Sequence, residues 1–318
     1  MRIVYMGTPP FAVPPLQALI TAGHEVAGVI TRRDKPAGRG RSLTPPAVKI
    51  AAEQAGITVF QPKRIREPES VAAIRAMAPE VIVVAAYGQI LPREVLALPR
   101  LQRGCVNIHA SLLPAYRGAA PINWAIINGE TRTGITIMQM DEGLDTGAIL
   151  AQESISIDPR DTTGTLTKKL SRIGSRLIVD SLSRIEAGEI SPVPQDPGKA
   201  TLAPLLKKED GLINWELTAA VIHNRVRGLS PWPGAFSFLD GAMVKFLETE
   251  VVPGSGEPGT LTSQGKDSLA VGTGKELLRI VTIQPEGKKP MSAAEFLRGH
   301  RGAVGKQLKK KLIADWKL

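Results

Sequence analysis

Apolar runs alternate with amphipathic stretches through roughly the first 190 residues of the chain. Residues 81–86, Val-Ile-Val-Val-Ala-Ala, are apolar without a break, which is typical of a strand buried on both faces of a parallel sheet. The pattern predicts strands at 3–6, 26–31, 59–60, 81–86, 105–109, 134–140 and 149–157, with helices at 12–22, 47–55, 70–77 and 163–186. We therefore predict an α/β domain with a Rossmann-like, open and mostly parallel sheet.

The pattern changes after the long predicted helix. Residues 188–204 contain four prolines and two glycines, a composition typical of an interdomain linker. Beyond it, one helix within 211–224 precedes short β-like runs at 235–238, 244–247, 250–252, 269–271 and 277–283. Such spacing predicts a small all-β barrel. We expect an α/β domain over residues 1–189, a linker over 190–206 and a second domain over 207–318.

Composition limits the class of protein. A length of 318 residues, 43% hydrophobic residues and a mean hydropathy of −0.01 fit a soluble protein with two domains. No apolar run approaches the ~20 residues that span a bilayer. The N-terminus reads as a strand rather than a signal peptide, so we expect a cytoplasmic protein with no membrane association. The single cysteine, Cys105, excludes an internal disulfide; we interpret it as a small buried hydrophobe, with a nucleophile as the alternative.

The net charge of +10 indicates an anionic partner, and nucleic acid is the obvious class. Basic residues are denser in the second predicted domain, and they also cluster at 32–41 and 298–318. The first cluster contains Arg39 and Arg41 among glycines, which suits contact with phosphate oxygens. A solvated surface is the plainer alternative for either cluster taken alone.

Three polar residues follow predicted strands, at the edge where open α/β sheets bind ligands. Asn107 and His109, two residues apart, lie on one face of a strand, and Asp145 lies on a glycine-flanked loop. An amide, an imidazole and a carboxylate suit acyl transfer without a covalent intermediate, although His109 and Asn107 also fit a structural role. Neither Gly-x-Gly-x-x-Gly nor a Walker lysine motif is present, so we expect neither NAD nor ATP. Four histidines without a close acidic or cysteine cluster predict no metal site.

Longer motifs point to a known family. The segment Asn107-Ile108-His109-Ala110-Ser111-Leu112-Leu113-Pro114, followed by Tyr116-Arg117-Gly118, resembles the signature of the 10-formyltetrahydrofolate-dependent formyltransferases. Residues 141–147, Asp-Glu-Gly-Leu-Asp-Thr-Gly, resemble the second motif of that family, and residues 6–9 and 87–92 match further landmarks. Residues 36–41, 224–229 and 231–235 are similar to the subgroup that formylates initiator methionyl-tRNA.

The resemblance implies transfer of a formyl group from 10-formyltetrahydrofolate, a co-substrate, to the free amine of initiator methionyl-tRNA. It implies that Asn107, His109 and Asp145 are catalytic. It also implies a folate-binding segment, which comprises Ser111, Leu112, Leu113 and Pro114. The residues expected to border the pterin pocket are Gln89, Ile90 and Leu91.

The remaining implications concern the tRNA. Arg39 and Arg41 match an inserted loop that meets the acceptor stem, and the second domain matches an OB-like barrel that contacts tRNA. Pro10 and Ala110 depart from the family pattern, which often has an acidic residue and a proline there. We expect a monomer.

Three alternatives remain open. A sibling enzyme that formylates an amino-sugar nucleotide would share the trio of Asn107, His109 and Asp145 but should lack the loop with Arg39 and Arg41. A second sibling hydrolyses formyl-folate with water. A non-catalytic RNA-binding protein would not need an intact Asn107, His109 and Asp145.

Overall fold

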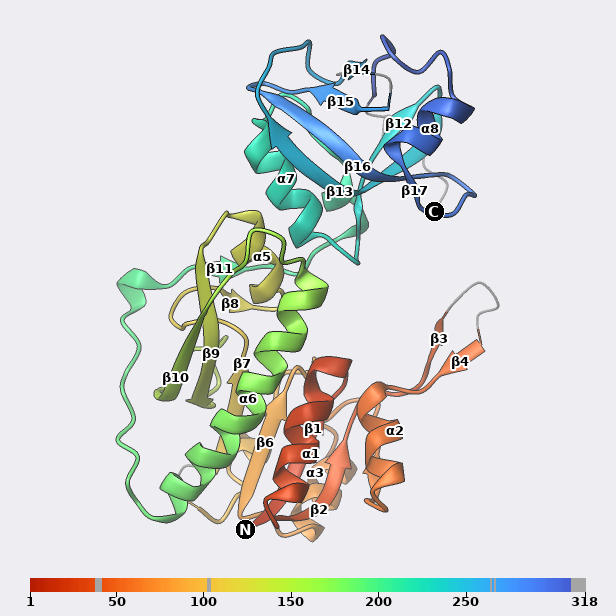
Figure 1. Ribbon diagram of the computed structural model, residues 1–318. Coiled ribbons are helices and arrows are strands. Elements are labelled where there is room, and N and C mark those ends of the chain that lie inside the picture. The colour runs from red at the N-terminus through yellow and green to blue at the C-terminus, as the bar shows by residue number, and fades with distance from the viewer. Residues whose placement is uncertain (38–41, 102–103, 264, 266, 310–318) are drawn as a thin grey trace. The chain divides into compact units, whose positions relative to one another are not determined.

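The structure is a computed structural model and describes residues 1–37, 42–101, 104–263, 265 and 267–309. Its contacts divide the chain into two compact units, each described separately below (Figure 1). Unit 1 comprises Met1–Pro121, Arg132–Ser156 and Thr167–Pro204. Unit 2 comprises Ile122–Thr131, Ile157–Leu166 and the chain from Leu205 onward.

Unit 1 is built on a seven-stranded sheet. Its strands are β1 (Arg2–Gly7), β2 (Glu25–Ile30), β5 (Val59–Phe60), β6 (Val81–Ala85), β7 (Cys105–His109), β9 (Arg132–Gln139) and β10 (Ile149–Ser156). They are ordered β10-β9-β7-β6-β1-β2-β5. The five strands from β7 to β5 pair in parallel, whereas β9 is antiparallel to both β7 and β10. The predicted Rossmann-like, mostly parallel sheet is confirmed.

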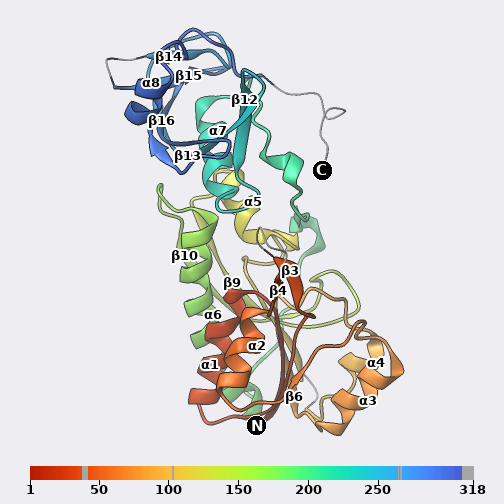
Figure 2. The same cartoon turned by 90° about the vertical axis from the view of Figure 1, so that its right-hand side faces the viewer.

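Helices cover both faces of this sheet, which explains why its central strands are apolar throughout. The helices are α1 (Val13–Thr21), α2 (Ala47–Gln54), α3 (Pro68–Ala76), α4 (Arg93–Leu96) and α6 (Thr163–Glu186), with a 3-10 turn η1 (Pro10–Ala12) before α1. Figure 2 shows α1, α2 and α6 on one face and α3 and α4 on the other. Every residue of β6 is buried.

Two small sheets complete unit 1, and neither was predicted. The antiparallel pair β3 (Lys35–Ala37) and β4 (Ser42–Thr44) is one of them. In the other, β8 (Arg117–Gly118) pairs in parallel with β11 (Leu202–Ala203), which follows the turn η2 (Pro197–Lys199). Val193 also bridges Ile149 on β10. The proline-rich segment is therefore hydrogen-bonded to the rest of unit 1 at several points.

Unit 2 contains a curled antiparallel sheet, which confirms the predicted second β domain. Its strands are β12 (Ala235–Leu239), β13 (Ala242–Val252), β14 (Leu261–Ser263), β15 (Leu269–Gly272), β16 (Leu277–Pro285) and β17 (Met291–Ser292). The order is β12-β13-β16-β15-β14, and β17 pairs with β16. The other elements are α5 (Pro121–Ile127, all but Pro121 in unit 2), η3 (Lys208–Gly211), α7 (Ala219–Gly228) and α8 (Ala293–Gly299).

The strand β13 replaces two shorter predicted strands. Its register with β16 shifts on both sides of Glu248, and such a bulge interrupts the alternation of buried and exposed residues that marks a strand. On the inner face, Trp215 packs edge-on against Phe246 with ring centroids 5.3 Å apart.

Candidate active site

The strand β7 carries the first two predicted catalytic residues. Asn107 pairs with Val84 and Met138, and His109 pairs with Thr136, so both lie within the sheet near its carboxyl edge. Both side chains are buried, at 9% and 5% exposure. Within the described residues, the Asn107 side chain has no hydrogen-bond partner. Its amide is therefore a donor that is available to a ligand.

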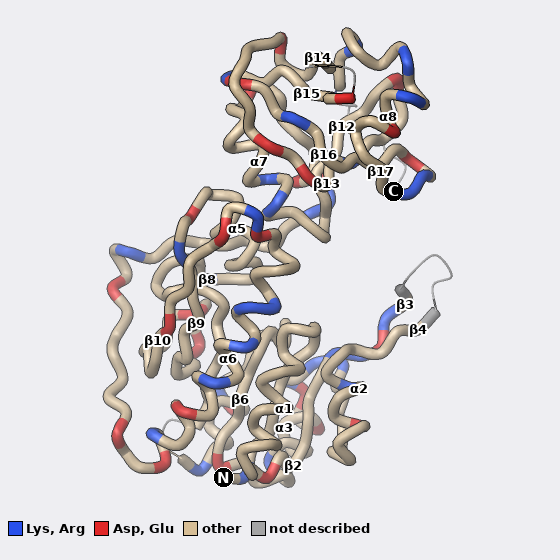
Figure 3. Tube along the Cα trace, viewed as in Figure 1, with Lys and Arg blue, Asp and Glu red and all other residues tan. Residues whose placement is uncertain are grey.

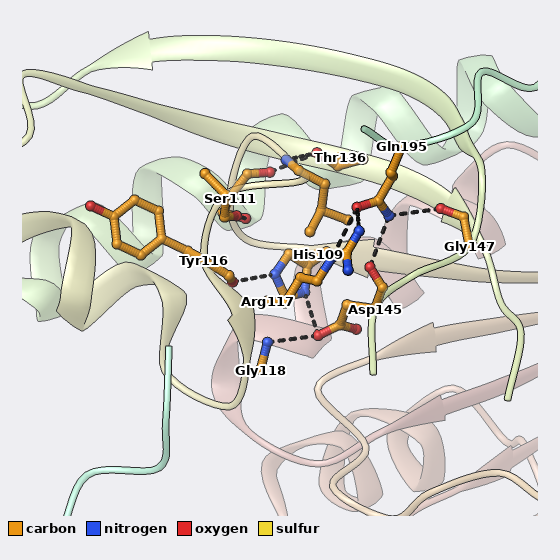
Figure 4. A network of polar contacts seen from close by, with 11 residues as sticks. His109, Ser111, Tyr116, Arg117, Gly118, Thr136, Asp145, Gly147 and Gln195 are labelled. Atoms are coloured by element: carbon orange, nitrogen blue, oxygen red, sulfur yellow. Dashed lines mark hydrogen bonds and ion pairs between the residues drawn. The ribbon is translucent and has the colours of Figure 1, made fainter. Parts of the chain in front are cut away.

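His109 contacts a polar atom on each ring nitrogen (Figure 4). Its Nε2 lies 2.9 Å from the Tyr116 carbonyl oxygen. A carbonyl only accepts, so Nε2 carries the hydrogen and donates it. Its Nδ1 lies 3.7 Å from Oδ2 of Asp145, an ion-pair distance rather than a hydrogen bond. The structure thus brings the carboxylate of Asp145 next to the ring of His109.

The Asp145 loop is held in an uncommon backbone conformation. Asp145 has φ +51°, in the left-handed region. Its Oδ2 accepts a hydrogen bond of 2.8 Å from the Gly118 N–H. A Cβ on Gly147 would lie 1.8 Å from the Gln139 carbonyl oxygen, so only glycine fits where the loop returns to β9.

Thr136 and Gln152 fix the backbone of the predicted folate segment. The Thr136 hydroxyl donates to the Ser111 carbonyl at 2.7 Å and accepts from the Leu113 N–H at 3.1 Å. Gln152 donates to the Leu113 carbonyl at 2.8 Å and to the Thr136 hydroxyl at 2.9 Å. The Ser111 hydroxyl donates to the Ala115 carbonyl at 2.6 Å, which closes the turn. Leu112 and Pro114 are half-buried in the same segment.

Two surface hollows lie near the other predicted pocket residues. One of about 240 Å³ is lined by Arg64, Ile65, Arg66, Gln89 and Ile90. Gln89 accepts a hydrogen bond of 2.9 Å from the Ile65 N–H, whereas Ile90 is 86% exposed. Leu91 instead lies in the core. A shallower hollow of about 530 Å³ includes Asp141, Glu142 and Gly143, so it adjoins the Asp145 loop.

Cys105 is a buried thiol without a catalytic environment. Burial raises its pKa to about 12, so it stays protonated at neutral pH and is a poor nucleophile. This agrees with the interpretation of Cys105 as a small buried hydrophobe on β7.

The predicted tRNA-contact residues Arg39 and Arg41 lie outside the described residues, between β3 and β4. The chain just before β3 is fixed by Asp34, whose carboxylate accepts from Lys49 at 2.9 Å and from Gln61 at 2.8 Å. These hydrogen bonds lower the pKa of Asp34, so its carboxylate stays charged.

Lys and Arg positions occur in both units (Figure 3). Two arginines of the motif at 224–229, however, bind within unit 2. Arg225 donates to the Asp210 carbonyl at 2.6 Å, and Arg227 donates to the Asp161 carbonyl at 2.8 Å and to Asn224 Oδ1 at 2.7 Å. Burial lowers the pKa of both guanidinium groups. These two side chains are therefore structural as well as basic.

The sequence did not identify two residues that join the site. Arg117 donates to Oε1 of Gln195 from Nε at 3.1 Å and from a terminal nitrogen at 2.7 Å. Gln195 donates to the carbonyls of Asp145 and Gly147 at 2.8 and 2.7 Å. Arg117 could have been found from the sequence, because it belongs to the Tyr-Arg-Gly motif. Gln195 lies among prolines and belongs to no motif that would have indicated it.

Two further observations concern ligands and surroundings. In the described part of the chain, no three His, Cys, Asp or Glu side chains form a group suited to a metal ion. None of the helices described combines the length and apolar character needed to cross a membrane.

Comparisons with known proteins give consistent matches. The family model described as formyl transferase matches residues 1–182, and the formyl transferase C-terminal domain matches residues 205–301. A protein of Citrifermentans bemidjiense named methionyl-tRNA formyltransferase is 49% identical over 98% of this chain and 97% of its own length. Proteins of the same name from Geobacter metallireducens and Thermodesulfovibrio yellowstonii are each 50% identical, over 97% and 94% of this chain and 98% and 96% of their own length.

Solved structures of lower identity share the fold. HypX from Aquifex aeolicus in complex with tetrahydrofolic acid has a TM-score of 0.65 at 19% identity, over 100% of this chain and 50% of that one. An N-formyltransferase from Helicobacter canadensis, in complex with folinic acid and dTDP-3-aminofucose, has a TM-score of 0.65 at 17% identity, over 87% of this chain and 97% of that one. At these identities the likeness shows the fold alone.

Proposed function

The chain belongs to the formyl transferase family, and from that premise we propose that it transfers the formyl group of 10-formyltetrahydrofolate to the amine of initiator methionyl-tRNA. The choice of methionyl-tRNA as the acceptor is supported by the near 50% identity, over almost the whole chain, to relatives named methionyl-tRNA formyltransferase. The product is N-formylmethionyl-tRNA, which serves translation initiation. Charged tRNA is made in the cytoplasm, so we place the protein there, as a monomer.

The reaction is a direct transfer at the carboxyl edge of the sheet. The neutral α-amine attacks the formyl carbon, a tetrahedral oxyanion forms, and the bond from that carbon to N10 of the folate breaks. The amide of Asn107, which has no partner among the described residues, donates to the oxyanion. Protonated His109 adds positive charge beside the oxyanion. Both of its ring nitrogens face acceptor oxygens, of the Tyr116 carbonyl and the Asp145 carboxylate, which suits a ring that carries a hydrogen on each nitrogen. Asp145 orients His109 and helps the proton lost by the amine to reach N10.

The other ligand contacts follow from the same site. We assign the segment Ser111–Pro114 to the folate, because Thr136 and Gln152 hold its backbone in a fixed conformation. Arg39 and Arg41 bind the acceptor stem, and the division of the chain into a catalytic domain (1–189), a linker (190–206) and an OB-like tRNA-binding domain (207–318) is supported by the two family matches.

The test is transfer of labelled formyl from 10-formyltetrahydrofolate to methionyl-tRNA. Asn107→Ala should lower kcat by ~10²–10³-fold with little change in tRNA binding, as loss of one oxyanion donor does. Wild-type turnover by this variant would remove Asn107 from the mechanism. Arg39→Ala should raise the KM for tRNA and leave folate affinity unchanged; a loss confined to folate would refute the tRNA role of this loop.

Parallel assays distinguish the acceptor. Formate release in the absence of tRNA would identify a hydrolase, and transfer to an amino-sugar nucleotide would identify a sugar formyltransferase. Either result, without transfer to methionyl-tRNA, would overturn the proposed acceptor.

A further inference from the structure

We propose that Gln195 is a positioning residue: its carboxamide holds Asp145 against His109 and so fixes the geometry of formyl transfer. The inference rests on the proposed function, because it concerns the same site. Gln195 lies in the proline-rich segment of unit 1, close to Val193, which bridges Ile149 on β10. It acts through Asp145 and through the neighbours of His109.

All the hydrogen-bonding capacity of the Gln195 carboxamide is used (Figure 4). Its two N–H groups donate to the carbonyls of Asp145 and Gly147, at 2.8 and 2.7 Å. Its oxygen accepts two N–H groups of Arg117, at 3.1 and 2.7 Å. Only a side-chain amide can donate twice and accept twice in this way, because a carboxylate has no donor and an ammonium has no acceptor.

The two carbonyls belong to a backbone that needs support. Asp145 has φ +51°, which a non-glycine residue adopts at a cost that the surrounding structure must offset. Without the Gln195 donors, the loop is free to relax toward ordinary backbone angles. Relaxation would move the Asp145 carboxylate away from the Gly118 N–H, now at 2.8 Å, and from His109 Nδ1, now at 3.7 Å.

Arg117 extends the same support to His109. It stands between Tyr116, whose carbonyl accepts from His109, and Gly118, whose N–H donates to Asp145. Tyr116 also has a left-handed backbone, with φ +62°. Through Arg117, Gln195 therefore links Tyr116, the hydrogen-bond partner of His109, to the loop that carries Asp145.

The segment that carries Gln195 is itself anchored on both sides. Val193 exchanges two backbone hydrogen bonds of 2.8 Å with Ile149. Thr201 accepts from the Tyr116 N–H at 2.9 Å through its hydroxyl and from the Arg117 N–H at 2.8 Å through its carbonyl. A displacement of about 1 Å at a reacting group can cost ~10²-fold in rate, so a precise anchor has a kinetic effect.

The test uses Gln195→Met, which keeps the length of the side chain and removes its hydrogen bonds. Gln195→Glu is the second variant: it still accepts from Arg117 but donates to neither carbonyl. Both should lower kcat by ~10–100-fold while the KM values for folate and tRNA change little. The matched control is Asp196→Ala, since among the described residues that exposed side chain contacts only Gly198 and Lys199. It should retain wild-type kcat.

Thermal unfolding midpoints, measured first, separate slower chemistry from loss of folded protein. If Gln195→Met does not fold, Gln195→Glu decides alone. Wild-type kcat in a folded Gln195 variant, or an equal loss in Asp196→Ala, would overturn the inference.

A double-mutant cycle tests whether Gln195 acts through Asp145. On an Asp145→Asn background, Gln195→Met should lower kcat by a smaller factor than in the wild type, because one of the groups it positions has been replaced and only the path through Arg117 and Tyr116 remains. Losses that multiply in full would mean that Gln195 acts independently of Asp145 and would overturn the inference. Wild-type kcat in Asp145→Asn alone would instead refute the proposed role of Asp145, so the two failures are distinguishable.

Discussion

Replacing Thr136 by Val should destabilise unit 1 and disturb the folate segment. Thr136 is fully buried on β9, and its hydroxyl donates to the Ser111 carbonyl and accepts from the Leu113 N–H and from Gln152. Valine has nearly the same shape and makes none of these hydrogen bonds. The change therefore removes polar contacts with little change in volume.

The size of the effect follows from which partners lose a contact. Gln152 keeps its hydrogen bond to the Leu113 carbonyl, so it is only partly affected. The buried Leu113 N–H and Ser111 carbonyl each lose a partner, at ~1–3 kcal/mol apiece, so the expected loss is about 2–6 kcal/mol. Thr136→Ser is the control: it keeps the hydroxyl and loses one buried methyl group, at ~1 kcal/mol.

Urea unfolding of the three proteins tests whether the midpoint concentration falls in the order wild type, Thr136→Ser, Thr136→Val. Far-ultraviolet circular dichroism follows the whole chain, whereas amide exchange at residues 111–113 reports on the segment itself. We expect the KM for folate to rise more in Thr136→Val than in Thr136→Ser. Equal midpoints and equal exchange in the two variants would show that the hydroxyl contributes nothing and would refute the reasoning.

Three further outcomes are expected. With a pKa raised to about 12, Cys105 should resist iodoacetamide at pH 8 in the folded protein and react in urea; rapid labelling of folded protein, seen by mass spectrometry, would contradict its burial. Gly118→Ala places a Cβ 2.8 Å from the Ala203 carbonyl oxygen at φ +119°, so it should lower both kcat and the thermal midpoint, by ~2 kcal/mol or more in stability; an unchanged midpoint would disprove the strain. Arg227→Ala should destabilise unit 2 by ~1–3 kcal/mol, because it removes the hydrogen bonds to Asp161 and Asn224. Tryptophan fluorescence measures this unfolding, since Trp124, Trp215 and Trp232 lie in that unit, and an unchanged unfolding midpoint would exclude a structural role for Arg227.

The sequence predicted the central sheet because its pattern depends on burial alone. Residues 81–86 read as a strand covered on both faces, and β6 occupies 81–85 with every residue buried. The pairing of β8 with β11 left no such pattern, because each strand is two residues long and exists only through its partner. For the same reason, the proline-rich composition of residues 188–204 indicated a linker without showing that these residues belong to unit 1 and that part of them pairs with β8.

The candidate site was predictable to a different degree at each residue. The spacing of Asn107 and His109 placed them on one face of a strand, and the glycines around Asp145 indicated a loop. The role of Gln195 was invisible, since an amide that supports a backbone 50 residues earlier leaves no local pattern. Basic composition counted Arg225 and Arg227 only toward the net charge of the second domain, whereas both side chains donate to carbonyl groups within unit 2.

The three residues of the trio differ in how far their polar groups are already engaged. His109 and Asp145 have fixed partners. Tyr116, whose carbonyl accepts from His109, and Asp145 itself both have a left-handed backbone conformation. The Asn107 amide alone among them has no partner within the described residues. In the proposed mechanism, an imidazole and a carboxylate that are positioned in advance leave little reorganisation for the moment of reaction, and an amide donor without a protein partner hydrogen-bonds most strongly once the oxyanion has developed. Such a division of roles would favour the transition state over the bound substrate, which is the difference that raises kcat.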